Sequence, residues 1–429
     1  MDKVDVIIVG GGLAGLSCAY ELADSGMTVI VLERGDFSGS KNVTGGRIYL
    51  SPLQNYLPDL WKEAPLERHV TKEFITLLGE TNSTTFEFYS DRFNQEPYPS
   101  YTILRAKFDR WFADLVSEKG VFVIPQKNVN GLIKDGEKVI GIKAEDEEIG
   151  ADCVVASDGI LSFLAEQAGL RKPFQPQHFA LGFKEVISLD PKTIEDRFRL
   201  GEKEGAAQLF VGTLTKGIMG GGFLYTNQES LSIGIVVGIH SLNQREPREE
   251  IYKFLDEFKE RPEIKNLIKG GEVVEYSAHL ISEGGLQIKP KVYGDGILLT
   301  GDAAGLGLNM LVTVRGMEYA MASGVLAGRT IKMAKEKNDF SASTLALYEK
   351  FLNESFIIKE MDSFKNSLSI LENKRLFSKY PQAISNLFEK VMRVDENPKE
   401  GLYKTVSQEL KKDFFNFQTF KDWMQFRKM

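Results

Sequence analysis

Residues 5–34 read DVIIVGGGLAGLSCAYELADSGMTVIVLER and constrain the fold more than any other segment of the chain. An apolar run, a glycine-rich turn, an amphipathic stretch and a second apolar run follow one another. The apolar period therefore changes from that of a buried strand to that of a helix and back. This order predicts a βαβ unit, which is the building block of a doubly wound parallel sheet.

The turn of this unit has the composition of a dinucleotide site. Gly10, Gly12 and Gly15 occupy the positions of a G-x-G-x-x-G turn, and Glu33 and Arg34 stand at the end of the second strand. Such glycines allow a tight turn and a close approach of backbone to a pyrophosphate, which the helix N-terminus attracts. An acid about 20 residues further on accepts hydrogen bonds from ribose hydroxyls. This motif alone fits either FAD or NAD.

Two later segments favour FAD. Residues 151–159, ADCVVASDG, predict a strand that ends beside the dinucleotide crevice, near Asp158. Residues 292–305, VYGDGILLTGDAAG, predict a second strand that ends at Gly301 and Asp302, before a helix-compatible stretch. Asp302 can accept a hydrogen bond from a polyol hydroxyl, and a helix N-terminus beyond it attracts negative charge. A flavin has a ribityl chain and an electronegative ring edge that suit this arrangement.

These three motifs, in this order, resemble the p-hydroxybenzoate hydroxylase and geranylgeranyl reductase superfamily of flavoproteins. The resemblance implies that Glu33 binds the AMP ribose, that Asp158 lies near the pyrophosphate and that Asp302 binds the ribityl chain. It also implies that Arg105, which opens the helix before the third strand, reaches the FAD. The alternative for Arg105 is a solvated arginine at the start of a helix.

Four further segments narrow the resemblance to FixC-type electron-transfer flavoprotein dehydrogenases, which are relatives of electron-transfer flavoprotein:quinone oxidoreductase. They are SKNVTGGRIY at 40–49, MGGGFLYTNQESLSIGIV at 219–236, EYSAHLISEGGLQIKPK at 275–291 and GDAAGLGLNMLVTVRGMEYAMASG at 301–324. The chain departs from this family at Leu311 and Val312, where the pattern often has a glycine followed by an aromatic residue. This departure puts the distance between that loop and the flavin in doubt.

Several residues are candidates for the surroundings of the flavin ring. Thr44, Gly45 and Gly46 form a loop with little side chain, which allows a close approach to the ring. Asn309 and Arg315 are the other candidates, and with Gly46 they make up the candidate catalytic set. We expect a helix over residues 313–329 with Arg315 in its first turn, where its charge opposes the helix dipole. Either a reduced flavin anion or a surface acid offsets that repulsion.

The resulting fold class is α/β, with a Rossmann-like FAD-binding lobe, an inserted antiparallel-sheet substrate lobe and a C-terminal helical region. The FAD lobe is expected at 1–72, 101–165 and 286–345. Alternating residues at 83–89 and 230–237 predict strands of the second lobe, which is expected at 73–100 and 166–285 as the quinone or substrate domain. Residues 346–429 make up the helical region.

Composition excludes other classes of protein. The formal net charge of −7 and the lack of a basic stripe argue against nucleic-acid binding. The two cysteines, Cys18 and Cys153, are too few for an iron–sulfur cluster, which takes four. The four histidines lack metal-ligand spacing, so we assign no metal. No apolar run approaches the roughly 20 residues of a membrane span, and the N-terminus lacks a signal-peptide pattern, so we expect a cytoplasmic protein.

The resemblance implies an electron relay. One non-covalent FAD would accept electrons from the α and β subunits of an electron-transfer flavoprotein and pass them towards menaquinone or ubiquinone. A small ferredoxin-like FixX partner would carry the iron–sulfur cluster. In relatives of this kind the donor flavoprotein can bifurcate electrons, which is a property of the complex. Two alternatives stay open: a stand-alone geranylgeranyl reductase-like ene-reductase acting on a lipid, and an assembly subunit with a structural FAD.

The last twenty residues of the chain mix aromatic and basic side chains. Six aromatic residues stand among five basic ones: Phe414, Phe415, Phe417, Phe420, Trp423 and Phe426, with Lys411, Lys412, Lys421, Arg427 and Lys428. Such a mixture suits the membrane interface, where rings lie at headgroup depth and basic groups meet anionic lipid. It also suits a partner-protein surface or an intramolecular core. We expect peripheral association with the inner face of the cell membrane.

Overall fold

The computed structural model describes residues 2–41, 46–173, 175–245, 250–283 and 285–427. Its internal contacts divide the chain into two compact units. The first unit comprises residues 1–67, 97–179 and 279–365, and the second comprises 68–96, 180–278 and 366–429. Residues 346–365 of the expected C-terminal region thus group with the first unit, and the remainder groups with the second.

The first unit is built on a parallel sheet with a short antiparallel edge. Its strands lie in the order β16 (Tyr293–Gly294), β17 (Ile297–Leu299), β10 (Glu147–Ala156), β1 (Asp2–Val9), β2 (Val29–Leu32) and β7 (Phe122–Ile124). The antiparallel strands β9 (Lys138–Ala144) and β8 (Val129–Asp135) extend from β10. In the central strand β1, Val6 faces Val29 on one side and Cys153 on the other. The apolar residues 6–9 of β1 and 29–32 of β2 are buried on both faces, as parallel strands between helices are, whereas Phe122 of the edge strand β7 is exposed.

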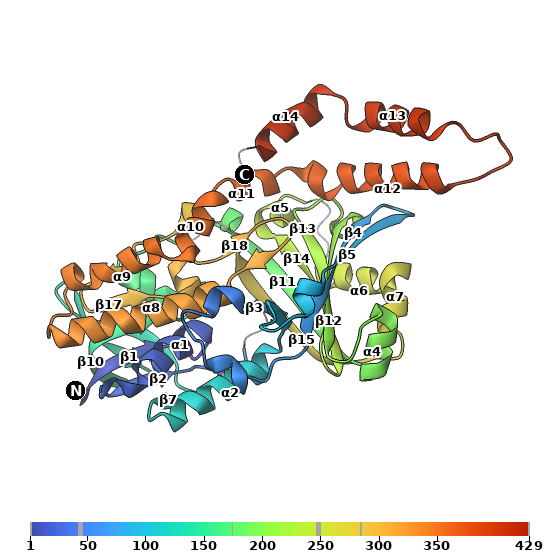
Figure 1. Ribbon diagram of the computed structural model, residues 1–429. Coiled ribbons are helices and arrows are strands. Elements are labelled where there is room, and N and C mark those ends of the chain that lie inside the picture. Colours follow the sequence, from blue (N-terminus) through green and yellow to red (C-terminus); the bar gives the residue numbers. More distant parts are fainter. Residues whose placement is uncertain (1, 42–45, 174, 246–249, 284, 428–429) are drawn as a thin grey trace. The chain divides into compact units, whose positions relative to one another are not determined.

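Helices cover this sheet, and two of them touch through glycines. They are α1 (Leu13–Leu22), α2 (Arg105–Glu118), α3 (Phe163–Gln167), α8 (Met317–Glu336), α9 (Ala342–Glu354) and α10 (Phe356–Ser363). Figure 1 shows α8 and α9 side by side, and α8 also packs against α1. A Cβ on Gly324 of α8 would lie 2.1 Å from the carbonyl oxygen of Ala14 in α1. A larger residue at that position would therefore separate the two helices.

Two small strand pairs complete the first unit. β3 (Arg47–Tyr49) pairs with β6 (Ser100–Thr102), and β18 (Leu308–Asn309) pairs with β19 (Val314–Arg315). The expected helix at 313–329 was wrong at its start, because residues 314 and 315 pair with β18 and α8 begins only at Met317. Arg315 consequently lies in a strand and not in the first turn of a helix.

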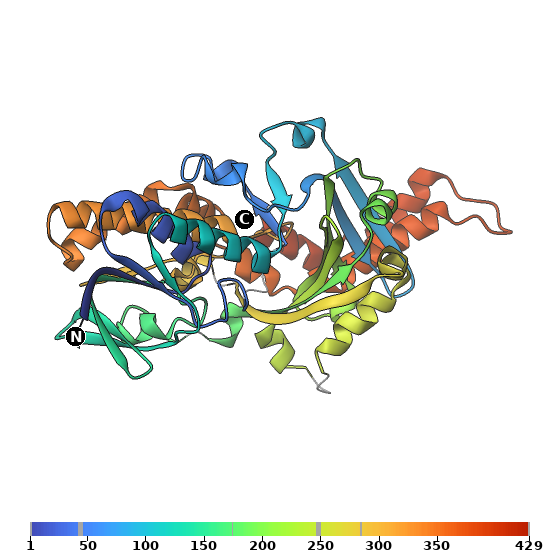
Figure 2. The same cartoon turned by 90° about the horizontal axis from the view of Figure 1, so that it is seen from below.

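The second unit contains a mostly antiparallel sheet with an outer hairpin. Its strands are β15 (Glu272–Ser282), β11 (Phe179–Ser188), β14 (Ser230–Gly238), β13 (Gly220–Thr226), β12 (Glu204–Gly212) and β4 (His69–Leu78), with β5 (Ser83–Tyr89) paired to β4. The strands expected at 83–89 and 230–237 are thereby confirmed. Only the pairing of β12 with β4 is parallel among the registers that the described residues give for this unit. Figure 2 shows β15, in yellow, at the edge of the sheet.

The helices of the second unit form two groups. Those within its sheet segments are α4 (Pro191–Phe198), α5 (Ile239–Asn243), α6 (Tyr252–Glu260) and α7 (Pro262–Ile268). Those near the end of the chain are α11 (Ser367–Leu371), α12 (Lys379–Met392), α13 (Leu402–Asp413) and α14 (Phe417–Phe426). Phe258 of α6 packs edge-on against Phe210 of β12, with ring centroids 5.0 Å apart. Buried aromatic rings of this kind hold the first group on the sheet.

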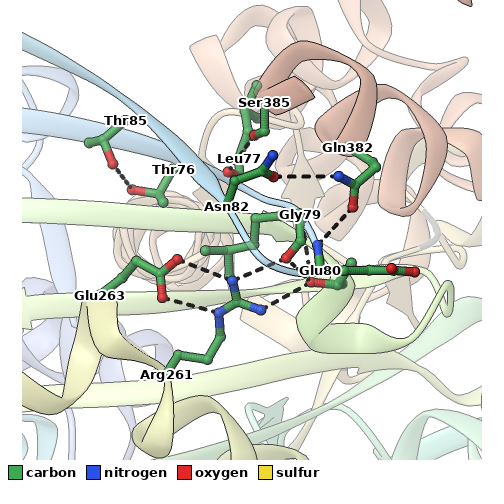
Figure 3. A network of polar contacts seen from close by, with 12 residues as sticks. Thr76, Leu77, Gly79, Glu80, Asn82, Thr85, Arg261, Glu263, Gln382 and Ser385 are labelled. Atoms are coloured by element: carbon green, nitrogen blue, oxygen red, sulfur yellow. Dashed lines mark hydrogen bonds and ion pairs between the residues drawn. The ribbon is translucent and has the colours of Figure 1, made fainter. Parts of the chain in front are cut away.

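Polar contacts attach α12 to the turn between β4 and β5 (Figure 3). The backbone N–H of Glu80 donates to Oε1 of Gln382 over 2.7 Å, and the hydroxyl of Ser385 donates to the carbonyl of Leu77 over 3.2 Å. From the other side, Nη2 of Arg261 donates to the carbonyl of Gly79 over 3.1 Å. The C-terminal helices are therefore joined to the sheet through the backbone of one hairpin turn.

A buried carboxylate attaches α14 in turn. Asp422 is 2% exposed, and its Oδ2 accepts hydrogen bonds from Nε of Arg375, over 2.6 Å, and from the hydroxyl of Tyr380. Burial acts to raise the pKa of Asp422, but the hydrogen bonds from Arg375 and Tyr380 outweigh it and hold that pKa well below its usual value. The charged form of Asp422 thus stabilises the docking of α14.

Acidification should release α14, because a carboxylate with a depressed pKa stabilises the fold above its unfolded value of 3.8 and loses that contribution as the pH falls through the folded value. At neutral pH, Asp422→Asn should have the same effect. Loss of one charged hydrogen bond of about 1.5 kcal/mol should make limited proteolysis within residues 414–427 roughly tenfold faster. The control is Asp196→Asn, since Asp196 pairs with Lys192 on the surface. Equal cleavage of the two variants would contradict the anchoring role.

Candidate cofactor site

In the turn between β1 and α1 the backbone lies very close to the backbone at the end of β10. Gly10 has a φ of +109°, and a Cβ there would lie 2.2 Å from the carbonyl oxygen of Ser157 at the end of β10. A Cβ on Gly15 would lie 2.0 Å from the carbonyl oxygen of Gly10. Gly12 precedes the first turn of α1 without a side-chain cap. The amides of this helix N-terminus are thus left for another acceptor, as in a phosphate site.

Glu33 lies directly after β2 and binds the glycine-rich turn. Its Oε2 accepts a hydrogen bond from the N–H of Gly11 over 2.8 Å, and its Oε1 accepts one from the N–H of Gly35 over 2.6 Å. Each carboxylate oxygen has a further lone pair available for a ligand hydroxyl. The neighbouring Arg34 is exposed. Glu33 therefore positions the loop in addition to the ligand-binding role that the sequence predicts.

Two serine hydroxyls beside this turn are buried and have no hydrogen-bond partner among the described residues. A Cβ on Gly11 would lie 2.4 Å from Oγ of Ser38, and one on Gly35 would lie 2.3 Å from Oγ of Ser40. Buried polar groups are normally hydrogen-bonded, so an unpaired pair of hydroxyls indicates a missing polar ligand. Sequence reasoning missed both serines, because nothing in their local pattern distinguishes them from ordinary loop residues.

Arg105 is the first residue of α2, as the sequence predicts, but it is not solvated. It is 8% exposed, and its Nε and Nη2 donate to the two carboxylate oxygens of Asp109 over 2.8 and 2.7 Å. Its charge affects the pKa values of two other residues of the site, Asp302 and His279. Burial raises the pKa of Asp302 while Arg105 opposes the rise, and burial followed by the charges of Arg105 and Arg34 lowers the pKa of His279. Arg105 therefore lies within electrostatic range of Asp302 and His279.

The two later motifs end beside the glycine turn. The hydroxyls of Ser157, after β10, and Thr300, after β17, are 2.6 Å apart. Gly301 begins a short 3₁₀ turn with a φ of +57°, and a Cβ there would lie 2.9 Å from Cβ of Ala14 in α1. Asp302 follows in that turn. The motifs around residues 10, 157 and 301 are thus brought to one edge of the sheet, as predicted.

Asp158 uses its carboxylate within its own loop. Its Oδ1 accepts from the hydroxyl of Ser162 over 2.7 Å, and its Oδ2 lies 3.3 Å from the N–H of Leu164 at the start of α3. Gly46 is buried, and its carbonyl accepts from the N–H of Ile103 over 3.1 Å. Thr44 and Gly45, the other two residues of that predicted loop, lie outside the described residues.

Arg315 is compensated by two acids, which is one of the two alternatives that the sequence left open, but it is buried rather than on the surface. It is 8% exposed, it contacts the carboxylate of Glu318, and its Nη1 donates to Oε1 of Glu360 over 2.9 Å. Its guanidinium also lies 5.0 Å from the ring centroid of Tyr49. Glu360 comes from α10, 45 residues along the chain, which no local pattern reveals.

The loop before Arg315 contains the departure noted in the sequence. Leu311 has a φ of +70°, a left-handed conformation that glycine adopts readily and leucine does not. Its N–H donates to Oδ1 of Asn309 over 2.9 Å, which holds the turn. Val312 beside it is 62% exposed. The backbone therefore keeps a geometry suited to glycine although the residue is leucine.

These features fit the predicted FAD. At Gly10 and Gly15 the backbone of the turn is too close to neighbouring backbone for a side chain. The carboxylate of Glu33 has lone pairs available for a ligand, and the hydroxyls of Ser38 and Ser40 have no partner among the described residues. All of them belong to the first unit.

Three family models match the chain in turn. One described as FAD dependent oxidoreductase matches residues 5–89, one described as ETF-QO, ubiquinone-binding matches 179–281, and one described as ETF-QO/FixC family C-terminal domain matches 368–429. Among curated proteins, the probable electron transfer flavoprotein-quinone oxidoreductase YdiS of Escherichia coli K12 is 40% identical over 411 residues, which are 96% of this chain and 95% of YdiS. Protein FixC of Azorhizobium caulinodans is 39% identical over 93% of this chain and 92% of its own length.

Solved structures share the fold. A geranylgeranyl bacteriochlorophyll reductase-like protein from Thermoplasma acidophilum aligns with a TM-score of 0.73 at 21% identity, over 97% of this chain and 98% of its own. The myxobacterial halogenase CndH, a variant of FAD-dependent halogenases, aligns with a TM-score of 0.66 at 18% identity, over 97% of each chain. These likenesses confirm the α/β flavoprotein fold class. The extended identity to YdiS and FixC, together with the three matching models, shows that this chain belongs to the ETF-QO/FixC family and is an FAD-dependent oxidoreductase.

Proposed function

We propose that this chain accepts electrons from an electron-transfer flavoprotein and passes them through FAD towards a membrane quinone. The observation that carries the proposal is the match of residues 179–281 to a model described as ubiquinone-binding, within a chain 40% identical to a probable flavoprotein-quinone oxidoreductase. FAD supplies reversible acceptance and release of electrons. The quinone domain would comprise residues 73–100 and 166–285, and the FAD domain 1–72, 101–165 and 286–345.

The proposed cofactor contacts follow from the geometry of the first unit. The amides after Gly10, Gly12 and Gly15 would bind the pyrophosphate, because they stand at the unsatisfied N-terminus of α1. Glu33 would accept the ribose hydroxyls. Asp302 would bind the ribityl chain.

Further residues of the proposed site lie along the cofactor and near its ring. Arg34, Arg105 and Asp158 would contact the phosphates or ribose, and Gly301 would allow the chain to approach the cofactor closely. Near the ring we propose Gly46 and Asn309, with Thr44 and Gly45. Arg315 is a weaker candidate for stabilising a reduced ring than its position in the sequence suggests, since Glu318 and Glu360 balance its charge.

The proposed partners are the α and β subunits of an electron-transfer flavoprotein and a ferredoxin-like FixX protein. An iron–sulfur cluster takes four cysteines, and this chain has two, Cys18 and Cys153, which are both buried. A cluster in the relay would therefore reside on another chain. Bifurcation of electrons would be a property of the whole complex.

For membrane docking we propose the C-terminal segment on the inner face of the membrane. No helix within the described ranges is long and apolar enough to cross a bilayer. Phe415, Phe417 and Trp423 are 74%, 82% and 55% exposed, and Lys421 and Arg427 are exposed beside them. Exposed aromatic rings with basic neighbours suit the lipid interface.

Glu33→Ala should weaken FAD retention, because it removes the ribose acceptor and the anchor of the amides of Gly11 and Gly35. At about 1.5–3 kcal/mol for each charged hydrogen bond, FAD per chain after gel filtration should fall by more than half. Glu21→Gln is the matched control, because Glu21 lies near the C-terminal end of α1, pairs with Lys332 of α8 and should not affect FAD retention. Undiminished FAD in Glu33→Ala would remove Glu33 from the site.

Because the FAD is proposed to be non-covalent, acid denaturation of the wild type should release all the yellow colour of the flavin.

Electron transfer should be measured directly with purified electron-transfer flavoprotein, held reduced by its own donor, and a short-chain quinone. Addition of this chain, with FixX if the partner copurifies, should raise the rate of quinone reduction at least tenfold over the flavoprotein alone. The apoprotein made by removing FAD is the control. A chain that leaves quinone oxidised but saturates a prenyl double bond would instead be an ene-reductase, and a flavin that no donor reduces would be structural.

Replacing Phe415, Phe417 and Trp423 by serine should lower sedimentation with anionic liposomes several-fold, because it removes apolar area that would be buried in the interface. The Arg375–Asp422 pair survives in this variant, so α14 stays docked. Truncation after Glu409 should have at least the same effect and leave the FAD content unchanged. Tyr403→Ser is the control, as Tyr403 is 88% exposed on α13. Full liposome binding by the triple variant would place the membrane surface elsewhere.

A further inference from the structure

Glu283 is an acid that the proposed relay does not use. It follows directly after β15 and is 1% exposed, yet neither of its carboxylate oxygens has a hydrogen-bond partner among the described residues. Its backbone N–H donates to the carbonyl of His178 over 2.9 Å. A buried carboxylate without partners is costly, and proteins keep such groups mainly at functional sites.

The segment that contains Glu283 lies along the proposed cofactor site. At one end, His279 is within electrostatic range of Arg34 and Arg105. Further along, Cβ and the carbonyl oxygen of Ser282 lie 3.4 Å from the position of a Cβ on Gly307, in the loop that follows Asp302. The hydroxyl of Ser282 is also buried without a partner in the described part of the chain. Residues 279–283 thus run from the two arginines to the loop that we place beside the flavin ring.

The surroundings of Glu283 bring the pKa of its carboxyl close to neutral pH. Burial raises the pKa of Glu283 to about 7. The side-chain amide of Asn309 on β18, which lies near the carboxyl but outside hydrogen-bond geometry, opposes that rise. Among the described residues, His178 contacts the backbone of Glu283 and His279 lies on the same segment, while Arg315 on β19 is paired with Glu318 and Glu360. None of these charges offsets the burial. Negative charge added beside the carboxyl would raise its pKa further.

We propose that Glu283 binds and releases a proton as electrons enter and leave the cofactor site. When two electrons arrive from a reduced carrier, one carboxylate oxygen of Glu283 takes one proton from solvent and an O–H bond forms. When the two electrons leave, that bond breaks and the proton returns. Glu283 thereby balances charge in a buried site. This inference rests on the proposed position of FAD, and it requires neither the quinone nor the partner proteins.

The test is a redox titration of the FAD-loaded chain at several pH values, with dithionite as reductant and proton uptake measured in weak buffer. As the pH rises well above the pKa of about 7, Glu283 becomes ionised in the oxidised wild type, and reduction by two electrons should then take up close to one more proton in wild type than in Glu283→Gln. Below about pH 6 the two proteins should take up equal numbers, because the carboxyl is already protonated. Equal uptake at every pH would overturn the proposal.

Two further variants keep the result interpretable. Glu283→Asp should restore the extra proton and shift the pH at which it appears. If Glu283→Gln fails to hold FAD, an infrared difference spectrum between reduced and oxidised protein decides the matter. A carboxylic acid band should then be present in wild type and displaced in Glu283→Asp, and an unchanged band would overturn the proposal. Glu185→Gln is the control, since Glu185 is a buried acid paired with Lys259 in the second unit, and it should behave as wild type.

If the extra proton is taken up but the protein reduces no quinone, the role of Glu283 is supported and the proposed relay is contradicted. If the protein reduces quinone without the extra proton, the relay is supported and the role of Glu283 is contradicted.

Discussion

The first unit depends on close contact between backbones. The turn at Gly10 lies against the carbonyl of Ser157, and Gly324 of α8 lies against the carbonyl of Ala14 in α1. A methyl group at either glycine would meet a backbone atom little more than 2 Å away, which no side-chain adjustment relieves. The contacts hold α1 between the end of β10 and α8. The N-terminal amides of α1, the carboxylate of Glu33 and the turn at Asp302 all take their positions from this arrangement.

Charge in this unit is balanced locally by pairs of residues. Arg105 is satisfied by Asp109 one turn later in the same helix, and Arg315 by Glu318 and Glu360. Glu283 differs, because it is buried without a cation or a donor of good geometry among the described residues. When a cofactor in this site is reduced and reoxidised, the ion pairs keep a constant charge. An unpaired carboxyl can instead change its charge by binding or releasing a proton. Asp109, Glu318 and Glu360 are each paired with an arginine, whereas Glu283 is the buried acid whose protonation can respond to the cofactor.

Local patterns predicted the elements that carry the site. The βαβ unit, the strand ending before Ser157 and the helix opening at Arg105 were confirmed, since each depends on a periodic apolar run and a turn residue within about ten positions. The start of the helix near Arg315 was wrong, because pairing of β18 with β19 competes with helix formation there. The partners of Arg315 and the burial of Ser38 and Glu283 depend on contacts between distant segments, which a single sequence does not contain.

The order of the motifs along the chain also determines when the cradle can form. Gly10 emerges early in synthesis, whereas its neighbours around Asp302 and Gly324 come about 300 residues later. At 5–20 residues per second the ribosome needs roughly 15–60 s to cover that interval. During roughly the first half of that interval β1 has its partner β2 but lacks its other neighbour β10, and the covering helix α8 (Met317–Glu336) follows only at its end. FAD therefore meets an assembled site only late in translation or after it, and the early apolar strands are exposed until then.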